Sequence, residues 1–183
     1  MLLETPQCNA GWNAPDFTLP DPHGTTHTLK DVMGPKGLLV AFICNHCPYV
    51  KAIAERMSAD ASALKEHGVH TVAIMPNDFA NYPDDAPDKM AAFAKAHAFA
   101  FPYLVDADQS VARAYGAVCT PDFFGFNASG ELQYRGRLDD KHKDSGEGRV
   151  PELLNAMRTI AESGVGPEQQ FPSMGCSIKW KQD

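Results

Sequence analysis

The sequence predicts an α/β fold in which a central β-sheet is flanked by helices. Residues 38–43 are six consecutive apolar residues, which is typical of a strand buried on both faces of a parallel sheet. Residues 69–75 form a second such run. Between the two runs, apolar residues recur at helical spacing from Val50 to Leu64, and Gly68 offers a C-terminal cap. Strand, helix and strand in this order indicate a parallel pairing joined by a crossover helix.

The remaining elements follow from local patterns. Residues 14–29 alternate apolar and polar side chains around a Pro/Gly turn and predict a short N-terminal β-hairpin, after which Asp31 can begin a brief helical turn. Residues 77–87 form a loop of turn formers that can border a site at the sheet edge, although a solvated connection is the default interpretation. We expect Asp85 to cap the following helix, which Pro87 can start.

The C-terminal half predicts a hairpin and a closing helix. A short helix should end at Gly116, two strands at 122–126 and 131–137 should pair, and a final amphipathic helix should span 150–162. Residues 138–148 are charged and contain glycine, so we expect a mobile loop. Residues 163–183 form a C-terminal tail that is too apolar to be fully solvated. We therefore expect one domain over residues 1–183, with a core at about 12–162 and the tail docked on it.

Composition excludes several classes of function. The formal net charge of −7 argues against nucleic acid or an anionic membrane as the main partner. The N-terminus lacks the basic and apolar regions of a signal peptide, and no run approaches a membrane span, so we expect a cytoplasmic protein. Five cysteines at irregular spacing, without a secretion signal, favour reactive or free thiols over a structural disulfide framework.

The strongest chemical signal is Cys44-Asn45-His46-Cys47, followed by Pro48, where the first buried strand hands over to the helix. Pro48 suits the first turn of a helix, which leaves Cys44 at or just before the N-terminus. A thiolate there meets the positive end of the helix dipole, so we expect a lowered pKa for Cys44, with His46 adding positive charge or a hydrogen bond. Cys44 would attack a disulfide, and Cys47 would resolve the mixed disulfide. The alternatives are a chance cysteine pair and an exposed turn histidine.

The order of elements resembles the thioredoxin superfamily over residues 12–162. The residues that carry the resemblance are the CxxC motif and Thr120-Pro121 before the hairpin. The opening Ala-Pro-Asp-Phe-Thr-Leu at 14–19 is similar to the AhpC/TSA branch, which includes redoxins, peroxiredoxin-like and TlpA-like proteins. The resemblance implies a thioredoxin-like fold with a mixed sheet. It also implies that Pro121 is cis and lies, with Thr120, against the cysteine pair, where backbone groups can bind an incoming peptide.

Several positions depart from the family patterns. Ile43 replaces the aromatic residue that thioredoxins carry before the first cysteine, and Asn45-His46 replaces Gly-Pro. A histidine before the second cysteine is similar to oxidising members such as DsbA, so the direction of electron flow stays open. Peroxiredoxins place their reactive cysteine in Pro-x-x-x-Thr-x-x-Cys. Here Cys44 stands in the place of that threonine, and no proline lies four residues before it.

Four functions remain in order of preference. The first is a thiol–disulfide oxidoreductase that needs no bound cofactor or metal. Its expected partners are protein or small-molecule disulfides and thiols, together with a protein that reduces it. We expect a monomer or a weak homodimer. The second is a thiol peroxidase with an antioxidant role. The third is a Cu(I)- or Zn(II)-binding metallochaperone-like module using Cys44, His46, Cys47 and a third thiol. The fourth is a redox-inert interaction domain. Cys119 and Cys176 are each either an additional redox thiol or a small buried residue.

Overall fold

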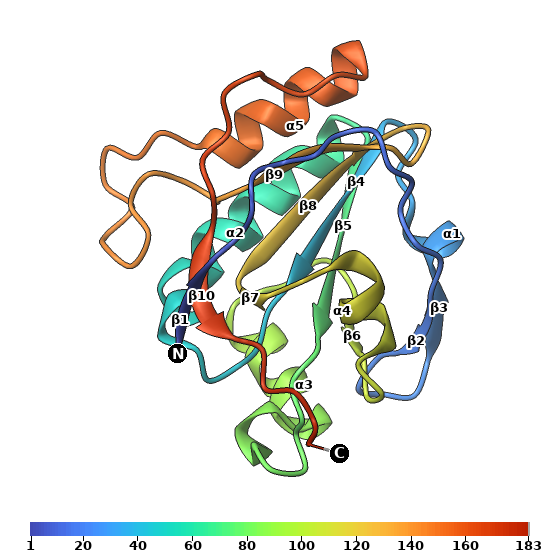
Figure 1. Cartoon of the computed structure of the whole chain (residues 1–183), viewed down its shortest axis with the longest axis vertical. Helices are drawn as coiled ribbons and strands as arrows, with labels where there is room; N and C mark the ends of the chain where they lie inside the picture. The colour runs from blue at the N-terminus through green and yellow to red at the C-terminus, as the bar shows by residue number, and fades with distance from the viewer. Residues whose placement is uncertain (183) are drawn as a thin grey trace.

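A five-stranded mixed sheet forms the centre of the computed structural model, which describes residues 1–182 (Figure 1). The strand order is β6-β5-β4-β8-β9, in which β4, β5 and β6 are parallel and β8 and β9 run antiparallel to their neighbours. This confirms the predicted fold class. The strands are β4 (Gly37–Phe42), β5 (Val69–Met75), β6 (Tyr103–Val105), β8 (Asp122–Asn127) and β9 (Leu132–Gly136).

Helices cover both faces of the sheet, which explains the unbroken apolar run of β4. Leu39 and Ala41 face the core under α2 (Pro48–Glu66), α3 (Pro87–Ala96) and α5 (Glu152–Ser163). Leu38, Val40 and Phe42 face a second core beneath α1 (Leu29–Val32), α4 (Ser110–Tyr115) and the N-terminal hairpin. Since alternate residues of a strand point to opposite faces, a strand between two cores must be apolar throughout.

The predicted short elements are present, with two changes at helix starts. The hairpin consists of β2 (Thr18–Pro20) and β3 (Thr26–Thr28), and Thr28 caps α1 through a reciprocal capping box with Asp31. A 3₁₀ turn, η1 (Pro83–Asp85), precedes α3, and the N-cap of α3 is Ala86. The prediction that Asp85 caps this helix is therefore wrong, and its carboxylate binds elsewhere.

The two ends of the chain meet beside the central sheet. β10 (Met174–Ser177) pairs with β1 (Leu2–Glu4) on one side and with β7 (Cys119–Thr120) on the other, so it is the middle strand of a small antiparallel sheet. Figure 1 shows β10 in red beside the dark blue β1. The C-terminal tail therefore docks on the strand that directly precedes Pro121.

Buried ion pairs fasten the segment after β9, which composition predicts to be mobile. Arg56 of α2 donates to Asp139 at 2.8 Å and to the carbonyl of His142 at 3.0 Å. Arg149 donates to Asp60 of α2 at 2.6 Å. Asp60 and Asp139 are almost fully buried, and buried carboxylates of this kind require such partners. Among the described residues, no helix is both long enough and apolar enough to cross a bilayer.

Candidate active site: three thiols around Thr120

The two cysteines of the CxxC motif lie in the connection between the end of β4 and the start of α2, and both are fully buried. Pro48 is the first residue of α2, so the N-cap is Cys47. The sequence predicts Cys44 at or just before the helix N-terminus, whereas Cys44 lies about one turn before the N-cap and Cys47 holds that position. Pro48 has no N–H to offer, and the backbone N–H of Val50, in the first turn of α2, helps to lower the pKa of Cys47. The dipole of α2 acts on Cys47.

Cys47 carries the negative charge of the site. Its pKa is lowered to about 4, first by a hydrogen bond from the Cys44 thiol and then by donors from Cys176 and Val50, while burial opposes the shift. The Sγ atoms of Cys47 and Cys176 are 2.9 Å apart. When Cys47 is protonated, its thiol can instead donate to the carbonyl oxygen of Thr120 at 3.2 Å. Because the donors outnumber this single acceptor, the thiolate is the favoured form at neutral pH.

Cys44 is the protonated partner of the pair. Its pKa is raised by the hydrogen bond that it donates to Cys47, by burial, and by the nearby carboxylate of Asp85. Thr120 opposes this shift through its Oγ1, which is 3.3 Å from the Cys44 sulfur. The predicted low pKa of Cys44 is thus wrong, since one charge is shared by two sulfurs and Cys47 holds it.

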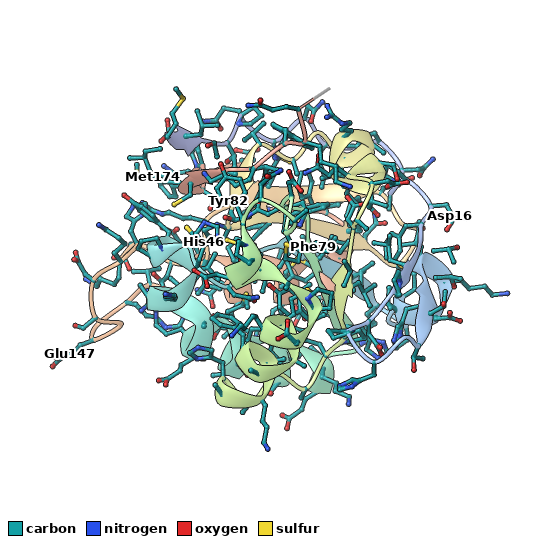
Figure 2. All side chains as sticks on the ribbon, turned by 90° about the horizontal axis from the view of Figure 1, so that it is seen from below. Asp16, His46, Phe79, Tyr82, Glu147 and Met174 are labelled. Atoms are coloured by element: carbon teal, nitrogen blue, oxygen red, sulfur yellow. The ribbon has the colours of Figure 1, made fainter. Side chains whose placement is uncertain are left out.

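His46 forms an ion pair with Asp85 beside the two sulfurs. The distance from His46 Nδ1 to Asp85 Oδ2 is 2.6 Å, and this hydrogen bond raises the pKa of His46. Asp85 also accepts from the backbone N–H of Asn45 and from the Asn77 amide. Although burial raises the pKa of Asp85, these donors lower it overall. Figure 2 shows His46 close to Tyr82, whose ring is stacked on the imidazole with centroids 6.1 Å apart.

Sequence reasoning missed Asp85 and Tyr103 as parts of the site. Asp85 lies in the loop that follows β5, and the carboxyl end of β5 opens on the same sheet edge as the cysteines. That position was the one available signal for Asp85. Tyr103 is buried in β6 and donates from its hydroxyl to Asn45 Oδ1 at 2.9 Å. Asn45, which lies between the two cysteines, is therefore held at its backbone by Asp85 and at its side chain by Tyr103.

Thr120 lies against the cysteine pair, and the peptide bond between Thr120 and Pro121 is cis. Thr120 presents its side chain to Cys44 and its carbonyl oxygen to Cys47. Strand alternation turns the neighbouring Cys119 to the opposite face. Burial strongly raises the pKa of Cys119, and its sulfur contacts the carbonyl oxygen of Pro121 at 3.6 Å. Of the two additional thiols considered, the structure brings Cys176 to the pair and keeps Cys119 apart.

Comparison with known proteins assigns this chain to a family. A model of the AhpC/TSA family matches residues 10–135. The chain belongs to the AhpC/TSA family. Among curated proteins, the thiol-disulfide oxidoreductase ResA of Bacillus subtilis is 29% identical over 124 residues, which is 67% of this chain and 64% of ResA.

Solved structures agree with the fold of this AhpC/TSA protein. The crystal structure of an uncharacterized conserved protein from Geobacillus kaustophilus has a TM-score of 0.93 and 39% identity, covering 100% of this chain and 98% of that one. Peroxidoxin BcpB from Mycobacterium tuberculosis has a TM-score of 0.63 at 20% identity, covering 84% and 96% of the two chains, which supports the thioredoxin-like fold alone. Both structures therefore agree with a thioredoxin-like fold for this chain of the AhpC/TSA redoxin family.

One group of residues in this AhpC/TSA protein has the composition of a metal site. The ligand atoms of Cys44, His46 and Asp85 lie within 4.8 Å of one another, and this is the one such group found within residues 1–182. The His46 nitrogen that would bind a metal already faces Asp85, whose carboxylate accepts from three donors. A metal would have to displace these bonds, so the group is better matched to positioning His46 than to holding an ion.

Proposed function

We propose that this protein is a thiol–disulfide oxidoreductase in which Cys47 attacks and Cys44 resolves. The observation that carries the proposal is the position of Cys47, which is the N-cap of α2 and has the Cys176 sulfur 2.9 Å from its own. The lowered pKa of Cys47, caused first by the hydrogen bond from Cys44, agrees with this position. The roles are the reverse of those that the motif alone predicts. The similarity to ResA, a thiol-disulfide oxidoreductase, supports the same class of reaction.

The proposed reaction has two exchange steps. The Cys47 thiolate attacks one sulfur of a substrate disulfide, forms a mixed disulfide, and releases the first substrate thiolate. Cys44 then gives up its proton to that thiolate and attacks the Cys47 sulfur, which releases the second substrate sulfur as a thiolate that takes a proton from solvent. The substrate gains two electrons, and the Cys44–Cys47 disulfide forms. The reverse sequence oxidises a substrate dithiol.

His46 should tune the balance between these directions. Its raised pKa increases the fraction of imidazolium beside Cys47, and a cation stabilises the thiolate of the reduced form. Stabilising the reduced form makes the disulfide a stronger oxidant. A measured potential of the Cys44–Cys47 couple against glutathione would place the protein on the oxidising or the reducing side.

The pH dependence of the first exchange step tests the assignment of roles. With a small aromatic disulfide as substrate, the wild-type rate should change little between pH 5 and 8, because Cys47 stays ionised over that range. Cys44→Ser should keep this flat profile. In Cys47→Ser the hydrogen bond to the Cys47 thiolate is gone, but burial and the Asp85 carboxylate still raise the pKa of Cys44. Any remaining reaction should therefore increase about tenfold per pH unit, since the thiolate fraction of Cys44 follows the pH.

Cys8→Ser is the matched control, because Cys8 packs against the core on the opposite face of the sheet. If Cys47→Ser retained the wild-type rate and profile while Cys44→Ser lost them, the order of attack would be reversed. If both variants remained as reactive as the wild type, the result would argue against the proposed oxidoreductase mechanism itself.

A thiol peroxidase is the second candidate, and the position of the thiolate favours it. Cys47 occupies the cysteine position of the Thr-x-x-Cys pattern of peroxiredoxins, with Cys44 in place of the threonine. The Cys47 thiolate would take one oxygen from a hydroperoxide, giving an alcohol and a sulfenic acid, which Cys44 would convert to a disulfide with loss of water. Peroxide consumption that requires Cys47 and proceeds without any protein disulfide would favour this candidate over the first.

A further inference from the structure

The C-terminal strand brings a third sulfur into contact with Cys47. β10 pairs antiparallel with β7, and Cys176 lies directly opposite Thr120. Side chains of directly opposed residues share one face of a sheet, and Thr120 faces the cysteine pair. The Cys176 sulfur consequently lies 2.9 Å from that of Cys47. A disulfide bond is about 2.0 Å long, so the sulfurs need to approach by roughly 0.9 Å.

The chain around Cys176 is shaped for this docking. A Cβ on Gly175 would lie 2.0 Å from the carbonyl oxygen of Thr120, so only glycine fits at that position. Ser173 donates from its hydroxyl to the carbonyl oxygen of Pro121 at 2.8 Å. Ile178, directly after β10, is buried in the second core, whereas Cys176 packs against the first. Pairing with β1 holds the outer edge of β10. The residues before and after Cys176, and the strands on both edges of β10, thus hold Cys176 in place.

We propose that Cys176 is a third redox thiol of the site, which resolves a mixed disulfide at Cys47 in competition with Cys44. The inference rests on the proposed exchange reaction. After Cys47 has captured one substrate sulfur, Cys176 passes its proton to the departing thiolate and attacks the Cys47 sulfur. The second substrate thiolate leaves and is protonated. A Cys47–Cys176 disulfide forms, and the substrate disulfide is reduced to two thiols.

The electrostatics of the resting site fit this order of events. Burial and the hydrogen bond to Cys47 raise the pKa of Cys176 to about 11, so it is a protonated donor while Cys47 is a thiolate. When Cys47 forms a mixed disulfide, it loses its negative charge. The hydrogen bond and the charge of Cys47 then no longer raise the pKa of Cys176. Cys176 then ionises more readily at the moment when a resolving thiolate is needed.

The two internal disulfides would differ in their effect on the site. A Cys47–Cys176 bond ties β10 covalently across β7, so the backbone edge at Thr120 stays covered. A Cys44–Cys47 bond leaves β10 held only by hydrogen bonds and packing. The choice of resolving thiol therefore decides whether the oxidised protein can open this edge to a peptide.

Reaction with oxidised glutathione in the absence of Cys44 tests the proposal. The reduced full-length variants Cys44→Ser and Cys44→Ser/Cys176→Ser are treated at pH 7, quenched with acid, alkylated, and analysed by intact mass and non-reducing peptide mapping. Cys44→Ser should end with a Cys47–Cys176 disulfide. It should carry at least about tenfold less glutathione than the double variant, because a thiol held in contact has an effective concentration far above millimolar glutathione.

Gly175→Ala tests the docking without removing a thiol. In the Cys44→Ser background it should displace β10 and shift the product from the internal disulfide toward the glutathione adduct. Adding Cys8→Ser instead should leave the internal disulfide unchanged. If Gly175→Ala does not fold, as judged by circular dichroism, the comparison with Cys176→Ser still decides the question.

The outcomes separate this inference from the proposed function. Equal glutathione uptake by Cys44→Ser and the double variant, without a Cys47–Cys176 bond, would overturn the role of Cys176 alone. Absence of any reaction at Cys47 in every variant would overturn the exchange mechanism and this inference together.

Discussion

Replacing Asp85 by asparagine should destabilise the fold in a pH-dependent manner. The carboxylate of Asp85 accepts from the Asn45 N–H at 2.8 Å, the Asn77 amide at 2.9 Å and His46 Nδ1 at 2.6 Å, and it is fully buried. In Asp85→Asn, the oxygen can still accept from Asn45. The new NH₂ group faces the amide of Asn77, whose donor is then left without an acceptor, and the ion pair with His46 is lost.

The size of the effect follows from these bonds. A buried donor without a partner costs about 1–3 kcal/mol, and a hydrogen bond to a charged group contributes about 1.5–3 kcal/mol. Because His46 can become neutral in the variant, part of the second loss is recovered, and we expect about 2 kcal/mol in total at pH 5.5. For a domain of this size, that loss lowers Tm by roughly 4–8 °C.

The sign of the pH dependence comes from both partners. The lowered pKa of Asp85 means that its contribution is present above its unfolded pKa, so it is fully present at pH 5.5 and at pH 9. The raised pKa of His46 means that its contribution is full below its unfolded pKa of about 6.5 and is lost as the pH rises through the folded value. The difference between wild type and variant should thus be larger at pH 5.5 than at pH 9.

Urea unfolding of the reduced proteins at the two pH values measures this difference, and NMR titration should show a lower pKa for His46 in the variant. Asp84→Asn is the matched control, since it removes the same charge from an exposed neighbour whose contact with Asn45 is made by the backbone carbonyl. The reasoning would be refuted if both variants unfolded at the same urea concentration, or if the loss were larger at pH 9.

Three further predictions concern the thiols and the residues beneath Pro121. Thiolate absorbance near 240 nm should persist on acidification to about pH 4 and be absent at neutral pH in Cys47→Ser. Thr120→Val removes the hydroxyl that favours the Cys44 thiolate, so single-turnover kinetics should show slower resolution with unchanged attack by Cys47. Arg135→Met leaves the buried carboxylate of Asp122 without its partner at 2.9 Å, and urea unfolding should show a loss of about 3–5 kcal/mol, partly restored by adding Asp122→Asn.

The sheet and its main helices could be predicted because their signals are local. The apolar run at 38–43 reports burial on both faces, and the structure places β4 between two cores. Pro48 marks the first turn of α2, as the structure confirms. The cis bond before Pro121 followed from the resemblance, and it is present.

The distribution of charge in the site could not be predicted, because it depends on contacts between distant residues. Asp85 reaches the Asn45 N–H across 40 positions, and Cys176 reaches Cys47 across 129. The motif alone predicts that the helix dipole acts on the cysteine nearest the first residue of the helix. An error of one turn in the predicted helix start therefore exchanges the roles of Cys44 and Cys47. Long-range donors then decide which sulfur is ionised.

The docked tail links access to the site with the stability of β10. The apolar residues of the tail predict docking, but β7 has only two residues and gives no signal of a partner strand. An open strand edge binds other strands readily, and β10 covers the edge at Thr120 while it brings Cys176 to Cys47. A peptide that pairs with this edge must first release β10, so its affinity is reduced by the free energy of that docking. Substitutions that weaken the docking, such as Gly175→Ala, should therefore strengthen peptide binding while they weaken resolution by Cys176.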